Sequence, residues 1–118
     1  MTDNYRARTL SLLEKLGMAY VVVDEPQGFR SSTPPIVAST GPLAVIRFHG
    51  HNAETYEKSN ISAAERFRYL YTEEELKNWV APIRTLAEAD QVHVLMNNCY
   101  GDYGVRNARQ LAELLAFS

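Results

Sequence analysis

The sequence predicts an α/β fold in which about three parallel strands alternate with helices. Short apolar runs of strand length alternate along the chain with segments whose apolar residues recur at helical spacing. The two strand candidates nearest the centre are apolar on both faces, which is typical of a parallel sheet covered by helices. The 118 residues are enough for one small domain, so we expect a single domain over 1–118.

Composition narrows the class of protein. Hydrophobic residues make up 46% of the chain, which favours a packed core, and a net charge of −2 gives no global basic signal for nucleic acid. Cys99 is the single cysteine, so an intrachain disulfide is excluded and a reducing compartment is expected. The polar start has no secretory signal, and no apolar run is long enough to span a membrane. We therefore expect a cytoplasmic protein that makes no membrane contact.

The first half of the chain contains one predicted helix and two predicted strands. Leucines at helical spacing predict a helix over Tyr5–Leu16, which Gly17 ends in a left-handed conformation. The β-branched run Met18–Asp24 predicts the first strand. A loop rich in proline and glycine follows over Glu25–Pro42, and Leu43–His49 predicts the second strand.

The second half begins with two capping-box signatures. Ser62 with Glu65 predicts a short helical turn, and Thr72 with Glu75 predicts the start of a longer helix. Pro82 lies inside that longer helix and is expected to kink it, because proline removes a backbone hydrogen bond. The apolar face of this helix comprises Leu76, Trp79, Val80, Ile83 and Leu86.

A third strand and a last helix complete the pattern. The run Val92–Asn97 predicts the strand, and a glycine-containing loop leads to a helix from about Val105 to Phe117. The predicted order is therefore helix, strand, loop, strand, helix, strand, helix.

Each predicted strand is apolar until its carboxyl end and then turns polar. The polar ends are Asp24 with Glu25, Arg47 with His49, and Asn97 with Asn98. In parallel α/β folds the carboxyl ends of the strands meet at one edge, and binding sites lie there. Three strands with the same change predict a functional site at this edge.

Arg47 has two interpretations. Strand alternation places it on one face with Val45 and His49. Because a charge in an apolar strand must be paired or must bind an anion, Arg47 either contacts a ligand or forms a structural ion pair, for example with Asp24. The residues by themselves leave both interpretations open.

His49 is the predicted acid–base residue, because the pKa of an unperturbed histidine lies near neutrality. A hydrogen-bonded structural role is the alternative. His49 and His51 form an H-x-H pair that could ligate a metal, but no third ligand is fixed nearby. We therefore predict no metal site, and the sequence names no cofactor.

The loop after the third strand leads into a helix that carries Arg106 and Arg109 in its first turns. Free N–H groups at this helix start, together with these arginines, could hold a phosphate or a carboxylate. The alternative is that Asn97 and Asn98 tie loops together through their side-chain amides.

These residues together resemble the YecE-like family, also called domain of unknown function 72 (DUF72). The motif R-F-H-G-x-N of that family is matched by Arg47–Gly50 and Asn52. Further similar segments are Asp24–Pro26, Ala64–Phe67, Tyr69–Tyr71, Glu74–Leu76, Trp79, Asn97–Asn98, Tyr100–Gly101, Asn107–Ala108 and Leu111. The likeness covers nearly the whole chain from about Tyr20 onward.

The resemblance implies a partial TIM-type (β/α) barrel with its site at the mouth formed by the carboxyl ends of the strands. It does not supply a reaction, because the activity of the family is not established, so whether the chain is an enzyme stays open. Together with the residue analysis it gives a candidate site that binds or hydrolyses an anionic substrate, either a phosphate ester or nucleic acid. The candidate catalytic residues are Asp24 and His49, and the candidate substrate-binding residues are Arg47, Asn52, Asn97, Asn98, Tyr100 and Asn107.

The sequence departs from the family in three ways. His51 stands where the family often has arginine, and Tyr56 stands near a usual tryptophan. The family chain is also about twice as long, so the resemblance covers only its C-terminal portion and Met1 falls in the middle of a barrel.

A barrel of this type needs eight strands, and the sequence contains three strong ones. We expect the chain to self-associate or to bind the missing half-barrel, since inward faces would otherwise lose their partners. The candidates for those inward faces are Tyr20, Val22, Val45 and Val94. A non-catalytic binding or assembly module, or a truncated remnant, is the alternative function.

Overall fold

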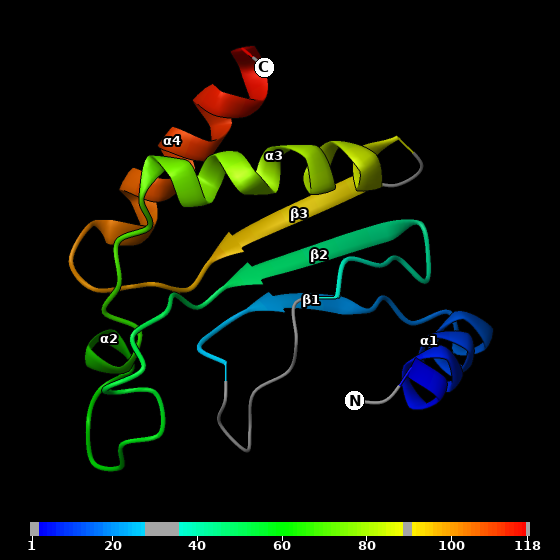
Figure 1. The fold of residues 1–118 in the computed structure, drawn as a ribbon, viewed down its shortest axis with the longest axis horizontal. Coiled ribbons are helices and arrows are strands. Elements are labelled where there is room, and N and C mark those ends of the chain that lie inside the picture. Colours follow the sequence, from blue (N-terminus) through cyan, green and yellow to red (C-terminus); the bar gives the residue numbers. More distant parts are fainter. Residues whose placement is uncertain (1–2, 28–35, 89–90, 118) are drawn as a thin grey trace.

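The structure is a computed structural model that describes residues 3–27, 36–88 and 91–117. Helices and strands alternate along it, in the order that the sequence predicts (Figure 1). The elements are α1 (Asp3–Leu16), β1 (Val21–Asp24), β2 (Leu43–Phe48), α2 (Ala63–Arg66), α3 (Glu73–Ala87), β3 (Gln91–Met96) and α4 (Tyr103–Phe117).

The three strands form one parallel sheet in the order β1-β2-β3, with β2 in the centre. Asp24 pairs with Phe48, and Phe48 pairs in turn with Met96, so the three strands end together, whereas β1 begins opposite Val45, two residues after the start of β2. The predicted α/β class with parallel strands is confirmed. All three carboxyl ends lie at one edge of the sheet, as expected for parallel strands joined by crossovers.

Helices cover one face of this sheet. Helices α3 and α4 pack on each other and on β3, whereas α1 lies apart from them near the start of β1 (Figure 1). The molecule measures 38 × 38 × 20 Å, and a thickness of 20 Å corresponds to one sheet layer and one helix layer. The chain therefore forms two layers, and the second face of the sheet has no helix over it among the described residues.

The core lies between the sheet and these helices. Val22, Ala44, Ile46 and Phe48 are fully buried on the helix-covered face. The Phe48 ring makes edge-on contacts with the rings of Tyr71 and Trp79, at centroid distances of 5.4 and 5.0 Å. Helix α3 adds buried side chains at helical spacing, which are Leu76, Val80, Ile83 and Leu86.

The opposite face of the sheet carries the alternate residues of each strand. On this face Val21 is 37% exposed and Leu95 is 46% exposed, and Arg47 is exposed as well. The predicted inward face is correct for Val45 but wrong for Val22 and Val94. Those two residues share the helix-covered face with Ile46, because paired residues in a parallel sheet point the same way.

Local chemistry explains where the first elements begin and end. Gly17 has φ +69°, and the N–H groups of Gly17 and Met18 donate to the carbonyls of Glu14 and Leu13, which is the Schellman motif that ends α1. Strand β1 begins at Val21 rather than at Met18. The Thr40 hydroxyl donates to the Met18 carbonyl and accepts from the Tyr20 N–H, so this segment is bonded to a side chain instead of to β2.

Both predicted helix starts are present. Thr72 and Glu75 form a complete capping box at the start of α3, and Ser62 accepts the Glu65 N–H at the start of α2. Helix α3 continues through Pro82 to Ala87. The predicted loop 25–42 contains no helix or strand at 25–27 or 36–42, and its middle, 28–35, lies outside the described residues.

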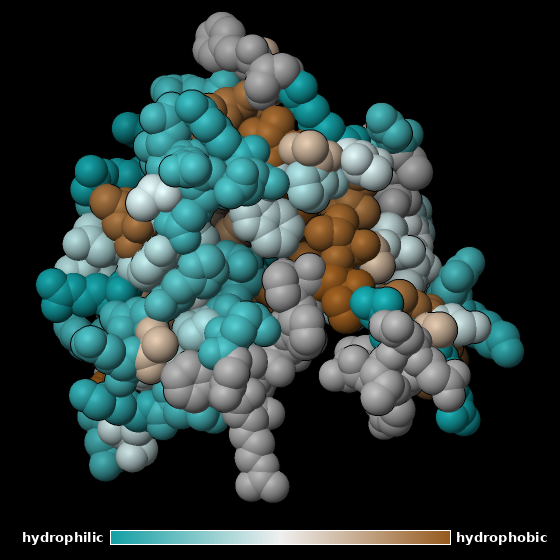
Figure 2. Space-filling view, in the orientation of Figure 1, coloured by the Kyte–Doolittle hydropathy of each residue, from teal (hydrophilic) through white to brown (hydrophobic). Residues whose placement is uncertain are grey.

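Apolar and hydrophilic residues occupy different regions of the surface (Figure 2). Figure 2 shows apolar surface over the strands beside α3, bordered by hydrophilic side chains over the helices. Among the described residues, no helix combines the length and the apolar character that crossing a membrane requires.

Replacing the central aromatic side chain of the core should destabilise the fold. Phe48→Ala removes a fully buried ring and leaves a cavity between β2 and α3, so we expect the free energy of unfolding to fall by about 3–5 kcal/mol. Urea unfolding followed by circular dichroism measures this change. The control is Leu12→Ala on α1, where the side chain is 56% exposed and the change should stay within about 0.5 kcal/mol. Equal effects of both substitutions would contradict this location of the core.

Candidate functional site

Two groups of polar side chains lie at the carboxyl ends of the strands, on opposite faces of the sheet. The open-face rim consists of Arg47, His49 and Asn97. The carboxylate–histidine cluster lies toward the helices and consists of Asp24, His51, Tyr69, Tyr71 and Glu75. The polar ends therefore gather at one edge, as predicted, but they divide between two faces.

Arg47 is held by an uncharged partner. With the Asn97 amide oriented so that its oxygen faces the guanidinium, Oδ1 accepts from Arg47 Nη2 at 2.6 Å and from Nε at 2.9 Å. Among the described residues no carboxylate pairs with Arg47. The predicted alternative of an ion pair between Arg47 and Asp24 is wrong, because Asp24 faces the helices and is bonded to His51. The guanidinium is thus oriented, and no carboxylate of the described residues neutralises its charge.

His49 lies beside Arg47 on the same strand end. Its ring stacks against Phe67 at a centroid distance of 5.0 Å, and its Nδ1 atom is buried without a hydrogen-bond partner among the described residues. Burial lowers the pKa of His49, and the Arg47 charge lowers it further, which outweighs the opposite effect of Glu25 and Asp24. His49 is therefore neutral near pH 7 and able to accept a proton.

Glu25 is a carboxylate at this edge that the predicted site did not include. It is 8% exposed, and its Oε2 accepts a hydrogen bond from the Tyr56 hydroxyl at 2.6 Å. Its charge acts on His49 more strongly than that of Asp24 does. The adjacent pair Asp24 and Glu25 was the available signal, but strand alternation alone does not say which of the two influences His49.

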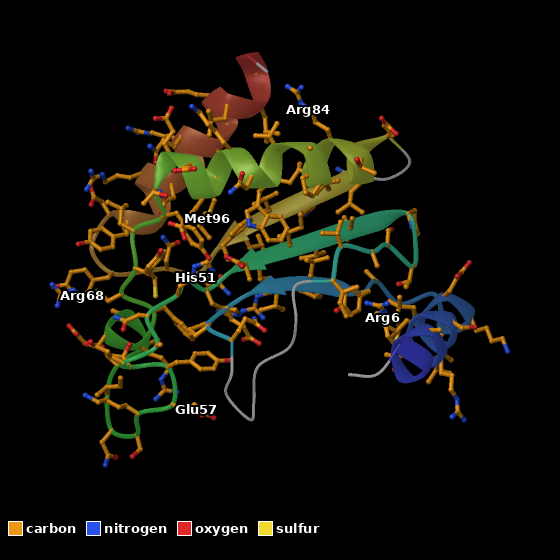
Figure 3. All side chains as sticks on the ribbon, in the orientation of Figure 1. Arg6, His51, Glu57, Arg68, Arg84 and Met96 are labelled. Atoms are coloured by element: carbon orange, nitrogen blue, oxygen red, sulfur yellow. The ribbon has the colours of Figure 1, made fainter. Side chains whose placement is uncertain are left out.

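His51 is the centre of the carboxylate–histidine cluster. Its Nε2 lies 2.8 Å from Asp24 Oδ2, and its Nδ1 lies 3.1 Å from Glu75 Oε2. His51 joins residues from β1, from the segment after β2 and from α3, and Figure 3 shows it beside the carboxyl ends of the strands. The Asp24 hydrogen bond raises the pKa of His51 above its ordinary value, against the lowering effect of burial.

Two tyrosines complete the cluster as donors. The Tyr71 hydroxyl donates to Asp24 Oδ2 at 2.7 Å and accepts the Gly50 N–H at 2.8 Å. The Tyr69 hydroxyl lies 2.8 and 2.9 Å from the two oxygens of Glu75. Burial, followed by the effects of Glu75, raises the pKa of Tyr69 to about 12, and burial together with Asp24 also raises the pKa of Tyr71. Both hydroxyls therefore keep their protons at physiological pH.

Glu75 has two roles at the start of α3. Its Oε1 accepts the Thr72 N–H at 2.9 Å and completes the capping box, while Oε2 faces His51. Burial raises its pKa, but the hydrogen bonds from Thr72 and Tyr69 outweigh this, so the pKa of Glu75 lies below its ordinary value. Glu75 is therefore ionised at neutral pH.

Two buried asparagines fasten the loops behind this cluster. The Asn98 amide donates to the Tyr69 carbonyl and to Asn107 Oδ1, both at 2.8 Å. Asn107 accepts the Tyr71 N–H and donates to the Tyr71 carbonyl. Both asparagines are fully buried, so the geometry favours the alternative in which side-chain amides tie loops together.

The remaining candidates lie at the outer rim. Asn52 donates to the Arg68 carbonyl at 2.9 Å, and the Arg68 guanidinium lies over the Tyr100 ring at 4.4 Å from its centroid. Figure 3 shows Arg68 directed away from the sheet. Asn52 and Tyr100 thus contact Arg68, whereas Arg47 and Asn97 contact each other.

The structure therefore divides the eight predicted residues by location. Arg47, His49 and Asn97 meet on the open face, and Asp24 lies in the cluster on the other face. Sequence reasoning did not include His51 among the site residues. Two signals were available in the sequence. His51 stands where the family often has arginine, and the predicted start of the longer helix is rich in glutamate.

No set of metal ligands is gathered in the part of the chain that the structure describes. Among residues 3–27, 36–88 and 91–117, no group of three or more histidine, cysteine, aspartate or glutamate side chains is arranged to hold an ion. His51 has both ring nitrogens on carboxylates, so it is not free to act with His49 as an H-x-H ligand pair.

The parallel sheet, the helices on one of its faces and the polar carboxyl ends of its strands define a parallel α/β unit of barrel type. The family described as "Protein of unknown function DUF72" matches residues 1–118, and the chain belongs to this family. A curated relative, UPF0759 protein YunF of Bacillus subtilis (strain 168), is 32% identical over 113 residues. That alignment covers 92% of this chain and 40% of the relative.

Solved structures of the family agree with the fold. A DUF72 family protein from Thermotoga maritima MSB8 superposes with a TM-score of 0.83 at 34% identity, covering 92% of this chain and 41% of that protein. A DUF72 family protein from Enterococcus faecalis V583 gives a TM-score of 0.85 at 27% identity, covering 99% of this chain and 44% of that protein. The chain thus spans about two fifths of its relatives, which agrees with the predicted C-terminal portion.

Removing the Tyr71 hydroxyl should weaken the cluster. Tyr71→Phe deprives the buried Asp24 of a donor and Gly50 of an acceptor, so we expect a loss of about 1–3 kcal/mol in the free energy of unfolding. Urea unfolding measures it. Tyr103→Phe is the matched control, because no hydrogen bond joins the Tyr103 hydroxyl to the described residues. A loss for Tyr103→Phe as large as that for Tyr71→Phe would disprove the assigned role of the Tyr71 hydroxyl.

Proposed function

We propose that this chain supplies an anion-binding site on the open face of the sheet, at the carboxyl ends of β2 and β3. The ligand class is a phosphate ester, either free or as part of a nucleic acid. The observation that carries the proposal is the guanidinium of Arg47, which is exposed and oriented by Asn97 but paired with no carboxylate among the described residues.

The chemistry of the guanidinium supports a phosphate ligand. Arginine has five N–H donors, and the Asn97 oxygen occupies two of them, so three remain for a ligand. The fork of donors matches two oxygens of a phosphate or carboxylate. Asn97 holds the side chain in place without cancelling its charge, which lowers the cost of ordering Arg47 when an anion binds.

His49 provides the acid–base function in this proposal. It is neutral near pH 7 and lies beside Arg47, so it can take a proton from an attacking water while Arg47 holds the negative charge. Asp24 does not share this role, because its carboxylate is bonded to His51 and Tyr71 on the other face. We give Asp24 a positioning role instead, and the carboxylate whose charge acts most on His49 is Glu25.

Substitution of Arg47 tests the binding site. We expect Arg47→Ala to weaken the binding of inorganic phosphate or a phosphate monoester roughly tenfold or more, because charge-assisted hydrogen bonds are lost. Arg47→Lys should weaken it less, since the charge remains but the fork is lost. Isothermal titration calorimetry measures both affinities.

The matched control for this experiment is Arg8→Ala, which removes an exposed arginine of α1 near the other end of the sheet. Asn97→Asp is the complementary variant, because a carboxylate at this position would neutralise Arg47 and reduce phosphate binding without removing the arginine. If phosphate affinity is the same in the original chain, in Arg47→Ala and in Asn97→Asp, the anion site does not exist.

The histidine separates binding from catalysis. His49→Ala should leave phosphate affinity within a few-fold of the original value and reduce hydrolysis of a phosphate ester by roughly 100- to 10,000-fold. Turnover of a phosphate monoester is measured with the full chain. A variant that hydrolyses the ester at the original rate would leave only the binding function.

A second function, assembly into a larger barrel, is favoured by the open edges of the sheet. Among the described strands β1 and β3 each have one unpaired edge. A cavity of about 490 Å³ runs along the β3 edge beside α4, lined by residues that include Leu95, Met96, Val105 and Ala108. Three strands together with five more would make the eight of a closed barrel, and relatives more than twice as long agree with that number.

The assembly function predicts two outcomes. The chain self-associates when it is alone, and it forms a defined complex with a half-barrel that consists of the other five strand–helix units of a family relative. Val105→Glu places a charge in the cavity at a residue that is 58% exposed, so it should weaken the complex without unfolding the chain. Sedimentation velocity measures both states, and Ala81→Glu on the exposed face of α3 is the control. A monomer that melts cooperatively in dilute solution and does not bind the half-barrel would contradict this function.

A further inference from the structure

The imidazole of His51 has a carboxylate oxygen at each of its two nitrogens. Asp24 Oδ2 lies 2.8 Å from Nε2, and Glu75 Oε2 lies 3.1 Å from Nδ1. A neutral imidazole carries one N–H, so it can donate to one of these carboxylates and must present a lone pair to the other. Only the imidazolium donates to both, and the geometry therefore corresponds to the protonated ring.

The surroundings reinforce this state. Two carboxylates and two tyrosines face His51, and the ring centroids of Tyr69 and Tyr71 lie 5.3 and 5.5 Å from the His51 ring. The tyrosine hydroxyls donate to the same carboxylates, so Asp24 and Glu75 each accept a neutral donor in addition to His51. The Asp24 hydrogen bond raises the pKa of His51, burial lowers it, and the charges of Asp24 and Glu75 raise it, with a net increase.

The cluster is joined to the backbone that carries the open-face rim. Tyr71 bonds Asp24 and also accepts the Gly50 N–H, and Gly50 has φ +88°. A β-carbon at Gly50 would lie 2.5 Å from the Tyr69 β-carbon, so this position is tightly packed. Because His49 directly precedes Gly50, the position of segment 49–51 depends on the bonds that His51 and Tyr71 make.

We propose that His51 is a proton-dependent positioning residue, whose imidazolium clasps the carboxyl ends of β1 and β2 to the start of α3 and thereby sets the position of His49. When the proton leaves, one of the two carboxylates loses the hydrogen bond from His51 and keeps that of its tyrosine, and two negative charges remain close together without the cation between them. The clasp does not depend on the anion site, so each can be tested without the other.

The sign of the pH effect follows from the direction of the shift. A folded-state pKa above that of the unfolded chain means that the folded protein binds the proton more tightly. The stability that His51 contributes is then complete below about pH 6.5, the ordinary histidine pKa, and is lost as pH rises through the higher folded-state pKa. The clasp is therefore closed below the raised folded-state pKa of His51 and opens as pH rises above it.

The direct test is an NMR titration of the three histidine rings in the full chain, with His51→Gln used to assign its signals. We expect the His51 ring to carry protons on both nitrogens at about pH 6 and to titrate above the ordinary value near 6.5. The His49 signals should shift a second time at the His51 midpoint, whereas those of His93, exposed on β3, should not. A His51 ring that titrates at or below about 6.5, or a His49 ring insensitive to it, would overturn the proposal.

Thermal stability gives an independent measurement. The melting temperature of the original chain should exceed that of His51→Gln by roughly 5 °C at about pH 6, and the difference should shrink toward zero by about pH 9. His51→Arg keeps a cation with several donors, so its advantage over His51→Gln should persist at both pH values. A difference between the original chain and His51→Gln that is equal at both pH values would show that His51 is merely structural. Failure of phosphate binding with this pH dependence intact would overturn the proposed function but not the clasp.

Discussion

The structure depends on how the buried charge of Asp24 is accommodated. Asp24 ends β1 in a position that is 6% exposed, and a carboxylate removed from water must be paired or hydrogen-bonded. His51 and Tyr71, which come from two different segments, both hydrogen-bond to Asp24. Glu75 of α3 accepts at the other ring nitrogen of His51. The cluster therefore joins the strand ends to the helix layer. It also holds the backbone next to the open-face rim, because Gly50, which follows His49, donates to Tyr71.

Alternation along the strands separates structural polar residues from those open to a ligand. Residues in register with Phe48 face the helices, where Asp24 and Asn98 find internal partners. Residues in register with Arg47 face the uncovered side, where Arg47 bonds only to a neutral amide among the described side chains. Because a one-residue step reverses the face, neighbouring polar residues in one strand end take part in different chemistry.

Most of the fold could be predicted from the sequence, because the signals are local. The apolar runs, the left-handed Gly17 and the Thr72 capping box each act within a few residues, and the structure contains all the predicted elements. Element limits were less accurate where a distant side chain intervened. Strand β1 begins three residues later than predicted, because the Thr40 hydroxyl hydrogen-bonds to the backbone of Met18 and Tyr20. The face of Val22 was also missed, since a strand with two apolar faces carries no sign of which face the helices cover.

The sequence by itself determined that this protein is a parallel α/β unit of the DUF72 family with polar strand ends at one edge, because periodicity and local motifs encode both. Only the tertiary structure decided which polar residues meet. Asp24 and His51 are 27 positions apart, and Tyr71 and Asp24 are 47 apart, so no local pattern records these bonds. Packing of α3 and α4 on one face brought those residues together and left Arg47 and His49 on the other, because helix packing and strand register act on the whole sheet at once.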